Sequence, residues 1–510
     1  MRVLIFHGYL LRGTGSNIYN ANLAQALARL GHEVHLLCQD LEAPRLGWID
    51  AIGRWTEGRL SVQQLRDRAG PGTISAYLPD IGGLLPLYVQ DEYEGFEARV
   101  FEDLSAEEIE RYITANVAAV TDVAEAAGGV DAALANHLVM GPVILARSGL
   151  AYAAKVHGSA LEYTVKPNPE TFLPFAREGI EAASGVLVGS RHTAESLWAA
   201  LPDLDLESKT RLGPPGVDID GFRPLRPAER PQRVEALAAR IEAEGGGGAF
   251  GRDAEVAAPA IRHYAAAEGP RVIFVGKLIV SKGVDLLLAA WPLVHAANPG
   301  ARLLAVGFGE FGDGLRRLLA ALGAGDIAEA REVARLGRGL EGGEAKPLSI
   351  LSAFLADPPP GYLDAAAAAA GSVAFAGRLE HDEVAELLPC AEALVMPSTF
   401  PEAFGMVAVE AASCGVLPVS AGHSGMQEVS RQLAPALSEE VAPLISFPVE
   451  AGAVAGIAER LNAWLALDEA TRASAREALV RTTHDLWSWE GVASGVIAAS
   501  QGRLDQLPKP

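Results

Sequence analysis

Short apolar runs that are followed by glycine-containing loops and then by helical patterns recur along this chain of 510 residues. Residues 3–6 precede a glycine-rich loop that runs from Gly8 to Gly15, and residues 271–275 begin the same succession in the second half. Such uninterrupted apolar runs are typical of strands that are buried on both faces of a parallel sheet. The pattern therefore predicts an α/β protein with two Rossmann-like halves.

The length also predicts more than one domain, because a single hydrophobic core rarely serves more than about 250–300 residues. Residues 214–224, rich in proline and glycine, interrupt the alternation and predict a boundary between a first domain, 1–213, and a second, 214–485. Residues 486–510 predict a final helix that is long enough to return to the first domain. Two stretches, near 225–269 and 328–371, are predicted to be insertions in the second domain, the first with one helix. Residues 41–105 are predicted to be irregular.

The acidic balance excludes several partners. The formal net charge is −22 and the sequence pI is about 5.0, which argues against general nucleic-acid binding and against a polybasic membrane contact. Cys38, Cys390 and Cys414 lie too far apart to indicate a disulfide framework or a zinc site, and they favour a reducing compartment. No signal-peptide layout and no membrane-spanning run is recognisable, so we expect a soluble cytoplasmic protein.

Two glycine motifs suggest a dinucleotide site, but neither combines the three glycines with a carboxylate at a strand end. After Gly13-x-Gly15 the third glycine position holds Ile18, although Asp40 lies where an NAD ribose would need a carboxylate. Residues 307–312 do match G-x-G-x-x-G, yet Asp326, which follows 19 residues later, does not lie at a strand end. We therefore interpret residues 307–312 as a tight turn between a strand and a helix and do not expect NAD.

Residues 397–428 combine features of a sugar-phosphate site. Glu402 lies in a loop that opens a helix, and Glu410 lies on that helix. The backbone amides at residues 404–406 are at the amino end of the helix, where anions bind well. Carboxylates accept hydrogen bonds from sugar hydroxyls. For either glutamate alone, a solvated surface helix remains the simpler interpretation.

Further candidates lie at other strand ends. Lys277 and Lys282 flank a junction between a strand and a helix and suit a diphosphate, although each is also a plausible surface lysine. His157 follows a strand whose carboxyl end should reach the ligand edge of an open sheet, but a lone histidine is more often structural. The acid pair Asp218-x-Asp220 resembles a metal motif, and turn chemistry explains it better.

Taken in order, the motifs resemble the retaining glycosyltransferases of family 4 (group 1), which have the GT-B fold: two Rossmann-like domains that face a central cleft, with a C-terminal helix that crosses back to the first domain. The motifs that carry the resemblance are Gly13-x-Gly15, His157-Gly158-Ser159, Pro215-Gly-Val-Asp218, Gly276-Lys277, Lys282-Gly283, Gly307-x-Gly309, Phe375-x-Gly377 and Glu402-x₇-Glu410 with Gly415. They span most of the chain outside the two insertions.

The resemblance implies that a hexose moves from a UDP- or GDP-sugar to an acceptor hydroxyl with retention of the anomeric configuration, without a metal or another cofactor. The first domain would then take a small or glycan acceptor, and the second would bind the donor. Lys277 and Lys282 would stabilise the diphosphate, Glu402 and His157 would contact the sugar, and Glu410 would hold the ribose. The remaining donor-binding candidates are Gly13, Gly15, Gly276, Leu379, Phe404, Gly405 and Met406.

One departure from the family pattern affects the phosphate site. Lys277 stands where the family usually has arginine, and lysine lacks the two-pronged donor geometry of a guanidinium. The alternatives that remain are a GT-B nucleotide-sugar epimerase or phosphorylase and a non-catalytic nucleotide-sugar-binding protein. The base, the sugar, the acceptor and the oligomeric state stay open.

Overall fold

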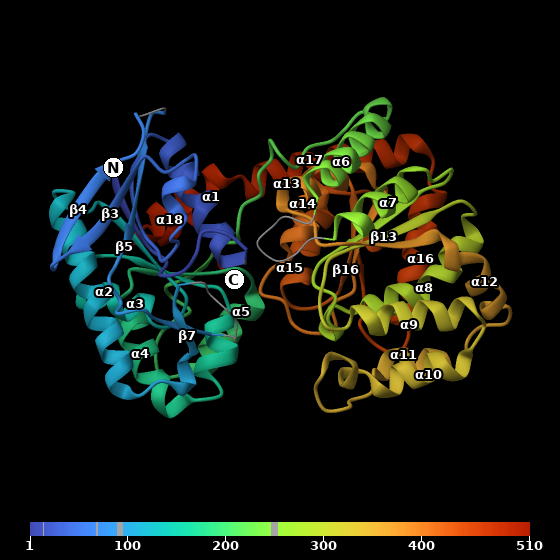
Figure 1. The fold of residues 1–510 in the computed structure, drawn as a ribbon, viewed down its shortest axis with the longest axis horizontal. Helices are drawn as coiled ribbons and strands as arrows, with labels where there is room; N and C mark the ends of the chain where they lie inside the picture. The colour runs from blue at the N-terminus through green and yellow to red at the C-terminus, as the bar shows by residue number, and fades with distance from the viewer. Residues whose placement is uncertain (14, 68–69, 89–94, 246–252) are drawn as a thin grey trace. The chain divides into compact units, whose positions relative to one another are not determined.

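The computed structural model describes residues 1–13, 15–67, 70–88, 95–245 and 253–510. The chain divides into two compact units (Figure 1). The first comprises Met1–Gly216 with Trp487–Pro510, and the second comprises Val217–Leu486. Each unit is described by itself.

Within its described residues, the first unit is built on a nine-stranded sheet with the order β11-β10-β9-β8-β1-β2-β5-β3-β4. Its strands are parallel except for the antiparallel pair of β3 and β4. The strands are β1 (Arg2–Phe6), β2 (Glu33–Leu37), β3 (Ala51–Thr56), β4 (Arg59–Gln64), β5 (Thr73–Leu78), β8 (Ala132–Asn136), β9 (Ala153–Val156), β10 (Gly185–Val188) and β11 (Thr210–Leu212), and a separate pair is formed by β6 (Leu84–Leu87) and β7 (Glu97–Val100).

Helices cover both faces of this sheet. They are α1 (Gly15–Arg29), α2 (Ala106–Ala126), α3 (Gly141–Arg147), α4 (Pro169–Ala182), α5 (Arg191–Ala200) and α18 (Trp489–Ser500). One face packs against α2, α3 and α4, and the other packs against α1 and α18. The central strands β8, β9 and β10 are buried along their whole length, as parallel strands between two helical layers must be.

The C-terminal helix α18 belongs to the first unit, as predicted. Trp489 is 3% exposed and lies edge-on to Tyr19 of α1, with the ring centroids 5.5 Å apart. Figure 1 shows the two helices side by side, although more than 450 residues separate them in the sequence. The return of the chain therefore completes the core of the first unit.

In the second unit, the described residues form a parallel six-stranded sheet with the order β14-β13-β12-β15-β16-β17. The strands are β12 (Arg271–Val275), β13 (Arg302–Val306), β14 (Val373–Gly377), β15 (Ala393–Met396), β16 (Leu417–Ala421) and β17 (Ser446–Phe447). The helices are α6 (Arg230–Glu244), α7 (Ala254–Ala265), α8 (Val284–Ala297), α9 (Gly312–Gly323), α10 (Ile327–Leu336), α11 (Ser349–Ala356), α12 (Tyr362–Ala369), α13 (His381–Leu387), α14 (Met406–Ser413), α15 (Ser424–Leu433) and α16 (Ala453–Ala466), and α17 (Glu469–Trp487) ends at the unit boundary.

The strand order places a topological switch point in each sheet. In the first, the chain proceeds from β1 to β2 on one side and from β8 to β9 on the other. In the second, β12 and β15 are neighbours from which the order runs in opposite directions. Open α/β sheets bind ligands at the carboxyl ends of the strands beside such a point.

The structure corrects the expectation for residues 41–105 and adds detail to the two insertions. Residues 41–105 are expected to be irregular, but they contain β3 to β7. The insertion near 225–269 is expected to hold one helix and holds α6 and α7, whereas most of its glycine run lies outside the described residues. The insertion near 328–371 contains most of α10 together with α11 and α12.

Candidate functional site

The carboxyl edge of the second sheet brings Lys282 and Glu402 together. Lys282 ends a short turn, Val280–Lys282, that leads into α8, and Glu402 lies in the loop after β15. The Lys282 ammonium donates a hydrogen bond to Glu402 Oε1, and both side chains are about one-fifth exposed. The two residues are 120 positions apart in the chain, and the pairing of β12 with β15 explains their contact.

The loop after β16 fixes the backbone of Glu402. Its amide donates to Ser424 Oγ at 2.9 Å, and its carbonyl accepts from the Gly425 amide at 2.8 Å. A Cβ atom at Gly425 would lie 2.5 Å from the backbone of Phe404, so only glycine permits this approach. In addition, Ser398 Oγ donates to Glu402 Oε1 at 2.8 Å. The Glu402 carboxylate is therefore held by a serine and a lysine.

Residues 404–406 lie at the amino end of α14, which begins at Met406 with Gly405 as its N-cap. Amides at a helix start favour anions because they point outward and carry the positive end of the helix dipole. The local geometry suits the predicted contact with a phosphate or a sugar. That contact itself stays a prediction.

Glu410 is a buried carboxylate on α14, 5% exposed, and its partner is a residue that the sequence analysis missed. His381 Nε2, at the start of α13, lies 2.9 Å from Glu410 Oε1. Burial opposes the charging of His381, but Glu410, and to a smaller extent Asp218 and Asp382, outweigh it and raise the pKa of the imidazole. The only signal in the sequence is that His381 closely follows the Gly377-Arg-Leu379 turn.

Lys277, in contrast, is exposed after β12, and no carboxylate among the described residues lies within ion-pair distance. It therefore differs from Lys282, whose charge is partly used by Glu402. Leu379, the candidate contact for the base, follows β14 and is 9% exposed. The neighbouring Arg378 guanidinium lies 5.8 Å from the centroid of the Phe308 ring, which is exposed after β13.

The loop at residues 307–312 packs closely on the loop that carries Lys277. Gly307 and Gly309 have φ values of 147° and 151°, and a Cβ at Gly307 would lie 1.7 Å from the Gly276 carbonyl oxygen. Asp326 accepts a hydrogen bond from the Glu329 amide as the N-cap of α10. The motif is therefore a tight turn, as the sequence analysis concluded.

In the first unit, His157 lies at the exit of β9 within a polar network. Its Nε2 is 2.8 Å from Asn136 Oδ1, and the Asn136 amide donates to Asn20 Oδ1 at 2.7 Å. Asn20 in turn lies 3.0 Å from His7 Nδ1. Burial, followed by the nearby His137, Lys155 and His7, lowers the pKa of His157 well below its usual value, so the ring is neutral at physiological pH.

Three buried members of this region were not predicted from the sequence. His7 connects α1 to the network, and burial lowers its pKa to about 4. His137 is 3% exposed, and neither ring nitrogen has a hydrogen-bond partner among the described atoms. Lys155 is 2% exposed, donates to the Gly213 carbonyl, and has a pKa that burial lowers to about 7.

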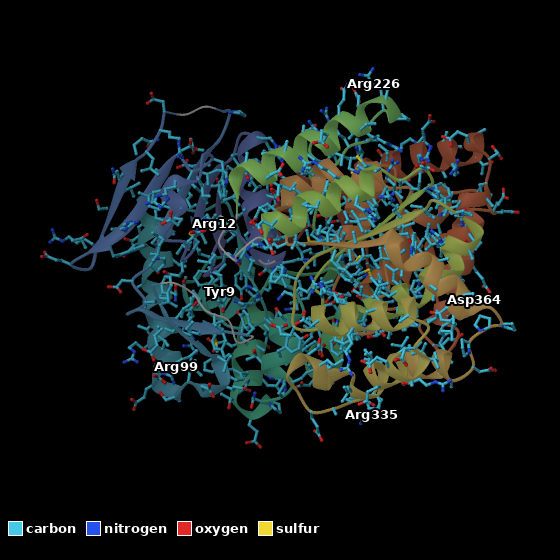
Figure 2. The ribbon with its side chains drawn as sticks, turned by 45° about the vertical axis from the view of Figure 1, so that its right-hand side comes forward. Tyr9, Arg12, Arg99, Arg226, Arg335 and Asp364 are labelled. Carbon is cyan, nitrogen blue, oxygen red and sulfur yellow. The ribbon has the colours of Figure 1, made fainter. Side chains whose placement is uncertain are left out.

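The glycine loop after β1 carries the other first-unit candidates. Gly13 is exposed with a φ of 93°, and Gly15, with no atom within 4 Å of a Cβ built on it, is the first residue of α1. Thr14 lies outside the described residues. Asp40 lies where an NAD ribose would need a carboxylate, but it is 1% exposed and pairs at 3.2 Å with Arg12, which Figure 2 labels. A carboxylate that is already buried and paired argues against NAD.

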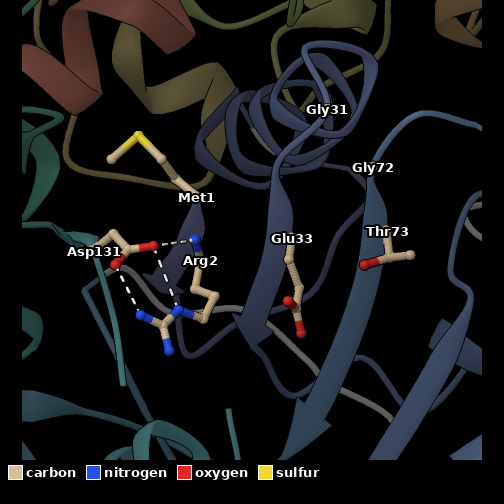
Figure 3. A pocket seen from close by; sticks show the side chains of 7 residues that line it. All are labelled: Met1, Arg2, Gly31, Glu33, Gly72, Thr73 and Asp131. Atoms are coloured by element: carbon tan, nitrogen blue, oxygen red, sulfur yellow. Dashed lines mark hydrogen bonds and ion pairs between the residues drawn. The ribbon is translucent and has the colours of Figure 1, made fainter. Parts of the chain in front are cut away.

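A hollow at the opposite edge of the first sheet is a less suitable ligand site (Figure 3). It lies at the amino ends of β1, β2 and β5, and the Arg2–Asp131 ion pair at 2.9 Å forms one side. Ligands of open α/β sheets bind at the carboxyl ends, where the predicted residues lie. We therefore assign this hollow no role.

The remaining sequence expectations concern metals, cysteines and membranes. Asp218 accepts from the Asp220 and Gly221 amides at 3.2 and 3.1 Å, which is turn chemistry as predicted. Within the described residues, no group of three or more His, Cys, Asp or Glu side chains could hold a metal ion. All three cysteines are buried and free. In the same part of the chain, no helix is both long and apolar enough to cross a membrane.

Comparison with solved structures shows the fold. A sucrose-phosphate synthase from Thermosynechococcus elongatus matches with a TM-score of 0.57 at 18% identity, over 99% of this chain and 98% of that one. The HepE protein of Anabaena, solved in complex with UDP, matches with a TM-score of 0.55 at 16% identity, over 99% and 100% of the two chains. The fold is therefore the GT-B fold of glycosyltransferases, as predicted.

Sequence comparison finds similar proteins over part of the chain. Residues 362–478 match the family described as Glycosyl transferases group 1. A GDP-mannose-dependent monoacylated alpha-(1-6)-phosphatidylinositol monomannoside mannosyltransferase of Corynebacterium glutamicum is 29% identical over 43% of this chain and 44% of its own length. The chain thus spans less than half the length of the curated relatives that it matches. Over the matched segment, the chain is similar to the group 1 glycosyltransferases.

Proposed function

We propose that this protein is a retaining glycosyltransferase that moves a hexose from a UDP- or GDP-sugar to an acceptor hydroxyl without a metal ion. The observation that carries the proposal is the contact of Lys282 with Glu402 at the carboxyl edge of the second sheet. A cation for the diphosphate and a carboxylate for the sugar thereby meet beside a switch point, where the ligands of open α/β sheets bind.

The proposed chemistry places positive charge where negative charge develops. As the bond between the sugar and the diphosphate breaks, the leaving diphosphate gains charge, and Lys277 and Lys282 stabilise it. Lys277 is exposed and available for this contact. A phosphate oxygen of the leaving group takes the proton of the attacking hydroxyl, on the same face of the sugar. No covalent nucleophile is invoked.

The carboxylates have separate roles in this proposal. Glu402, oriented by Ser398 and Lys282, accepts hydrogen bonds from hydroxyls of the donor sugar. Glu410 accepts from the ribose hydroxyls, and His381 holds one of its oxygens. Leu379, Gly276 and the amides of residues 404–406 complete the donor contacts.

In the first unit, His157 contacts the sugar as a neutral ring that is oriented by Asn136. Gly13 and Gly15 themselves carry no side chain that would exclude the diphosphate. The acceptor is a small molecule or a glycan. The three buried free cysteines support the cytoplasm as the compartment.

A panel of nucleotide sugars tests the proposal. GDP-mannose, on which the Corynebacterium mannosyltransferase depends, and UDP-glucose are the first donors to try. We expect nucleoside diphosphate release that depends on an acceptor and persists in EDTA, with an unchanged anomeric configuration in the product. Binding without turnover for every acceptor would favour a non-catalytic protein, and a rearranged free sugar would favour an epimerase.

A matched pair of variants tests the site. Glu402→Gln keeps the size of the side chain but loses its charge, and we expect a drop in kcat of about 10²-fold or more. Lys346→Ala removes an exposed lysine of the second insertion and should leave the rate unchanged. Equal rates for the two variants would contradict the role given to Glu402.

A further inference from the structure

The second insertion reaches the turn that carries Lys282. The segment 337–348 connects α10 to α11, and its Glu341 accepts a hydrogen bond from the Val280 amide. Val280 is the first residue of the turn Val280–Lys282. The turn has no side-chain cap of its own from Ile279, the residue that precedes it. Glu341 therefore satisfies an amide that the local sequence leaves open.

The backbone of the insertion holds Glu341 in place. The Arg338 amide donates to the Lys346 carbonyl at 3.1 Å, which closes the segment into a compact loop. Gly337 has a φ of 46°, and a Cβ there would lie 2.1 Å from the same carbonyl, so this closure requires glycine. The same insertion also contacts α8, the helix that follows the turn Val280–Lys282, because the Tyr362 hydroxyl of α12 donates to the Ala289 carbonyl at 2.8 Å.

The other side of the Lys282 turn is fixed by the loop that carries Glu402. The Thr399 amide donates to the Ser281 carbonyl at 2.9 Å, and a Cβ at Gly283 would lie 2.0 Å from the Pro397 carbonyl oxygen. Glu341 contacts Val280, the first residue of the turn, whereas this loop contacts Ser281 and Gly283. The insertion thus supplies a second anchor for the backbone from which Lys282 extends.

We propose that Glu341 is a positioning residue for the donor diphosphate and that it acts through the Val280 amide on the orientation of Lys282. This inference rests on the proposed function, and it assigns a role to an insertion that the sequence motifs leave unexplained. An anchored turn aims the ammonium before the ligand arrives, so less ordering is needed on binding. A hydrogen bond to a charged acceptor is stronger than one between neutral groups.

Two variants of the full-length protein separate positioning from mere stability. Glu341→Ala removes the acceptor, whereas Glu341→Gln keeps an amide oxygen in the same place. Glu344→Ala is the matched control, because Glu344 is an exposed carboxylate of the same loop. The readouts are affinity for UDP and GDP by titration calorimetry and amide hydrogen exchange of the peptide 277–283.

For Glu341→Ala we expect faster exchange in this peptide and affinity weaker by about tenfold. Glu341→Gln should stay within about threefold of the wild type, and Glu344→Ala should match it. Unchanged exchange in Glu341→Ala, or equal damage in the Ala and Gln variants, would overturn the inference. Tighter binding by Glu341→Ala would also overturn it, because Glu341 would then be occupying an amide that a phosphate uses.

Failure of the proposed function has a different signature. The wild type would then bind neither UDP nor GDP, while the 277–283 amides remained protected by Glu341. In that case the proposed role of Glu341 in positioning the diphosphate would be wrong, and only its contact with the turn would remain.

Discussion

Replacing Gly307 by alanine perturbs the closest backbone approach at the carboxyl edge of the second sheet. The new Cβ would lie 1.7 Å from the Gly276 carbonyl oxygen, whereas ordinary contact begins at 3.4 Å. The two loops must therefore separate by 1.7 Å (3.4 − 1.7). Because Gly276 precedes Lys277, the movement displaces a lysine that the proposed mechanism uses.

The energetic cost has two parts. A side chain at a φ of 147° costs about 1–2 kcal/mol in conformational strain. Forcing extra volume into a packed region costs about 1–3 kcal/mol more. We expect Gly307→Ala to lower the free energy of unfolding by about 2–5 kcal/mol, which corresponds to a fall in Tm of roughly 4–10 °C for a unit of this size.

Gly325→Ala is the matched control. Gly325 also has a positive φ, 70°, but no atom lies within 4 Å of a Cβ built there. It should therefore show the strain alone, about 1–2 kcal/mol. Scanning calorimetry of the full chain measures both variants, and titration with UDP and GDP follows the effect on Lys277. If Gly307→Ala loses no more stability than Gly325→Ala and binds nucleotide normally, the close approach of the two loops is refuted.

Three further predictions concern charged groups. Lys155→Met should stabilise the protein by about 2–4 kcal/mol near pH 7, because burial lowers the folded-state pKa of Lys155 to about 7 while the unfolded chain keeps the usual value. The wild type should accordingly gain stability as the pH rises from 7 towards 10.5. Thermal melts of the variant should lack this dependence on pH, and an equal dependence in both proteins would contradict the burial of a charged Lys155. Lys282→Ala should lower kcat by about 10²-fold with a smaller effect on donor KM. Nucleotide release measures both constants, and a change in KM alone would argue against transition-state stabilisation by Lys282. His381→Gln should remove a contribution to stability that is complete below pH 6.5 and lost as the pH rises through the raised folded-state pKa. It should also raise donor KM by about tenfold if Glu410 holds the ribose, and wild-type KM in this variant would exclude the link.

The sequence predicted the strands that are buried on both faces. The run before Gly8 and the run before Gly276 are apolar without interruption, and both are central strands. It did not predict β4, because residues 59–64 are mostly exposed and only Leu60 and Val62 are large and apolar. The available signal was the turn at Glu57-Gly58, where both residues have positive φ as a tight hairpin requires.

The positions of the candidate residues were predicted in part. Lys282, Glu402 and Glu410 follow strand ends or open helices, so their positions could be inferred from local patterns. Their partners could not be inferred in this way, because the contact of His381 with Glu410 depends on how two separate helices pack against each other. Likewise, the contact between Glu341 and Val280 comes from an insertion that no local pattern connects to the turn Val280–Lys282.

The placement of α18 determines when the first unit can finish folding. The second unit is encoded entirely between the two segments that form the first. During synthesis, the side of α1 that meets Trp489 therefore stays uncovered until α18 has left the ribosome. A premature stop near residue 486 would leave an intact second sheet and a first sheet with an uncovered apolar face, a surface that chaperones and other nascent chains would bind.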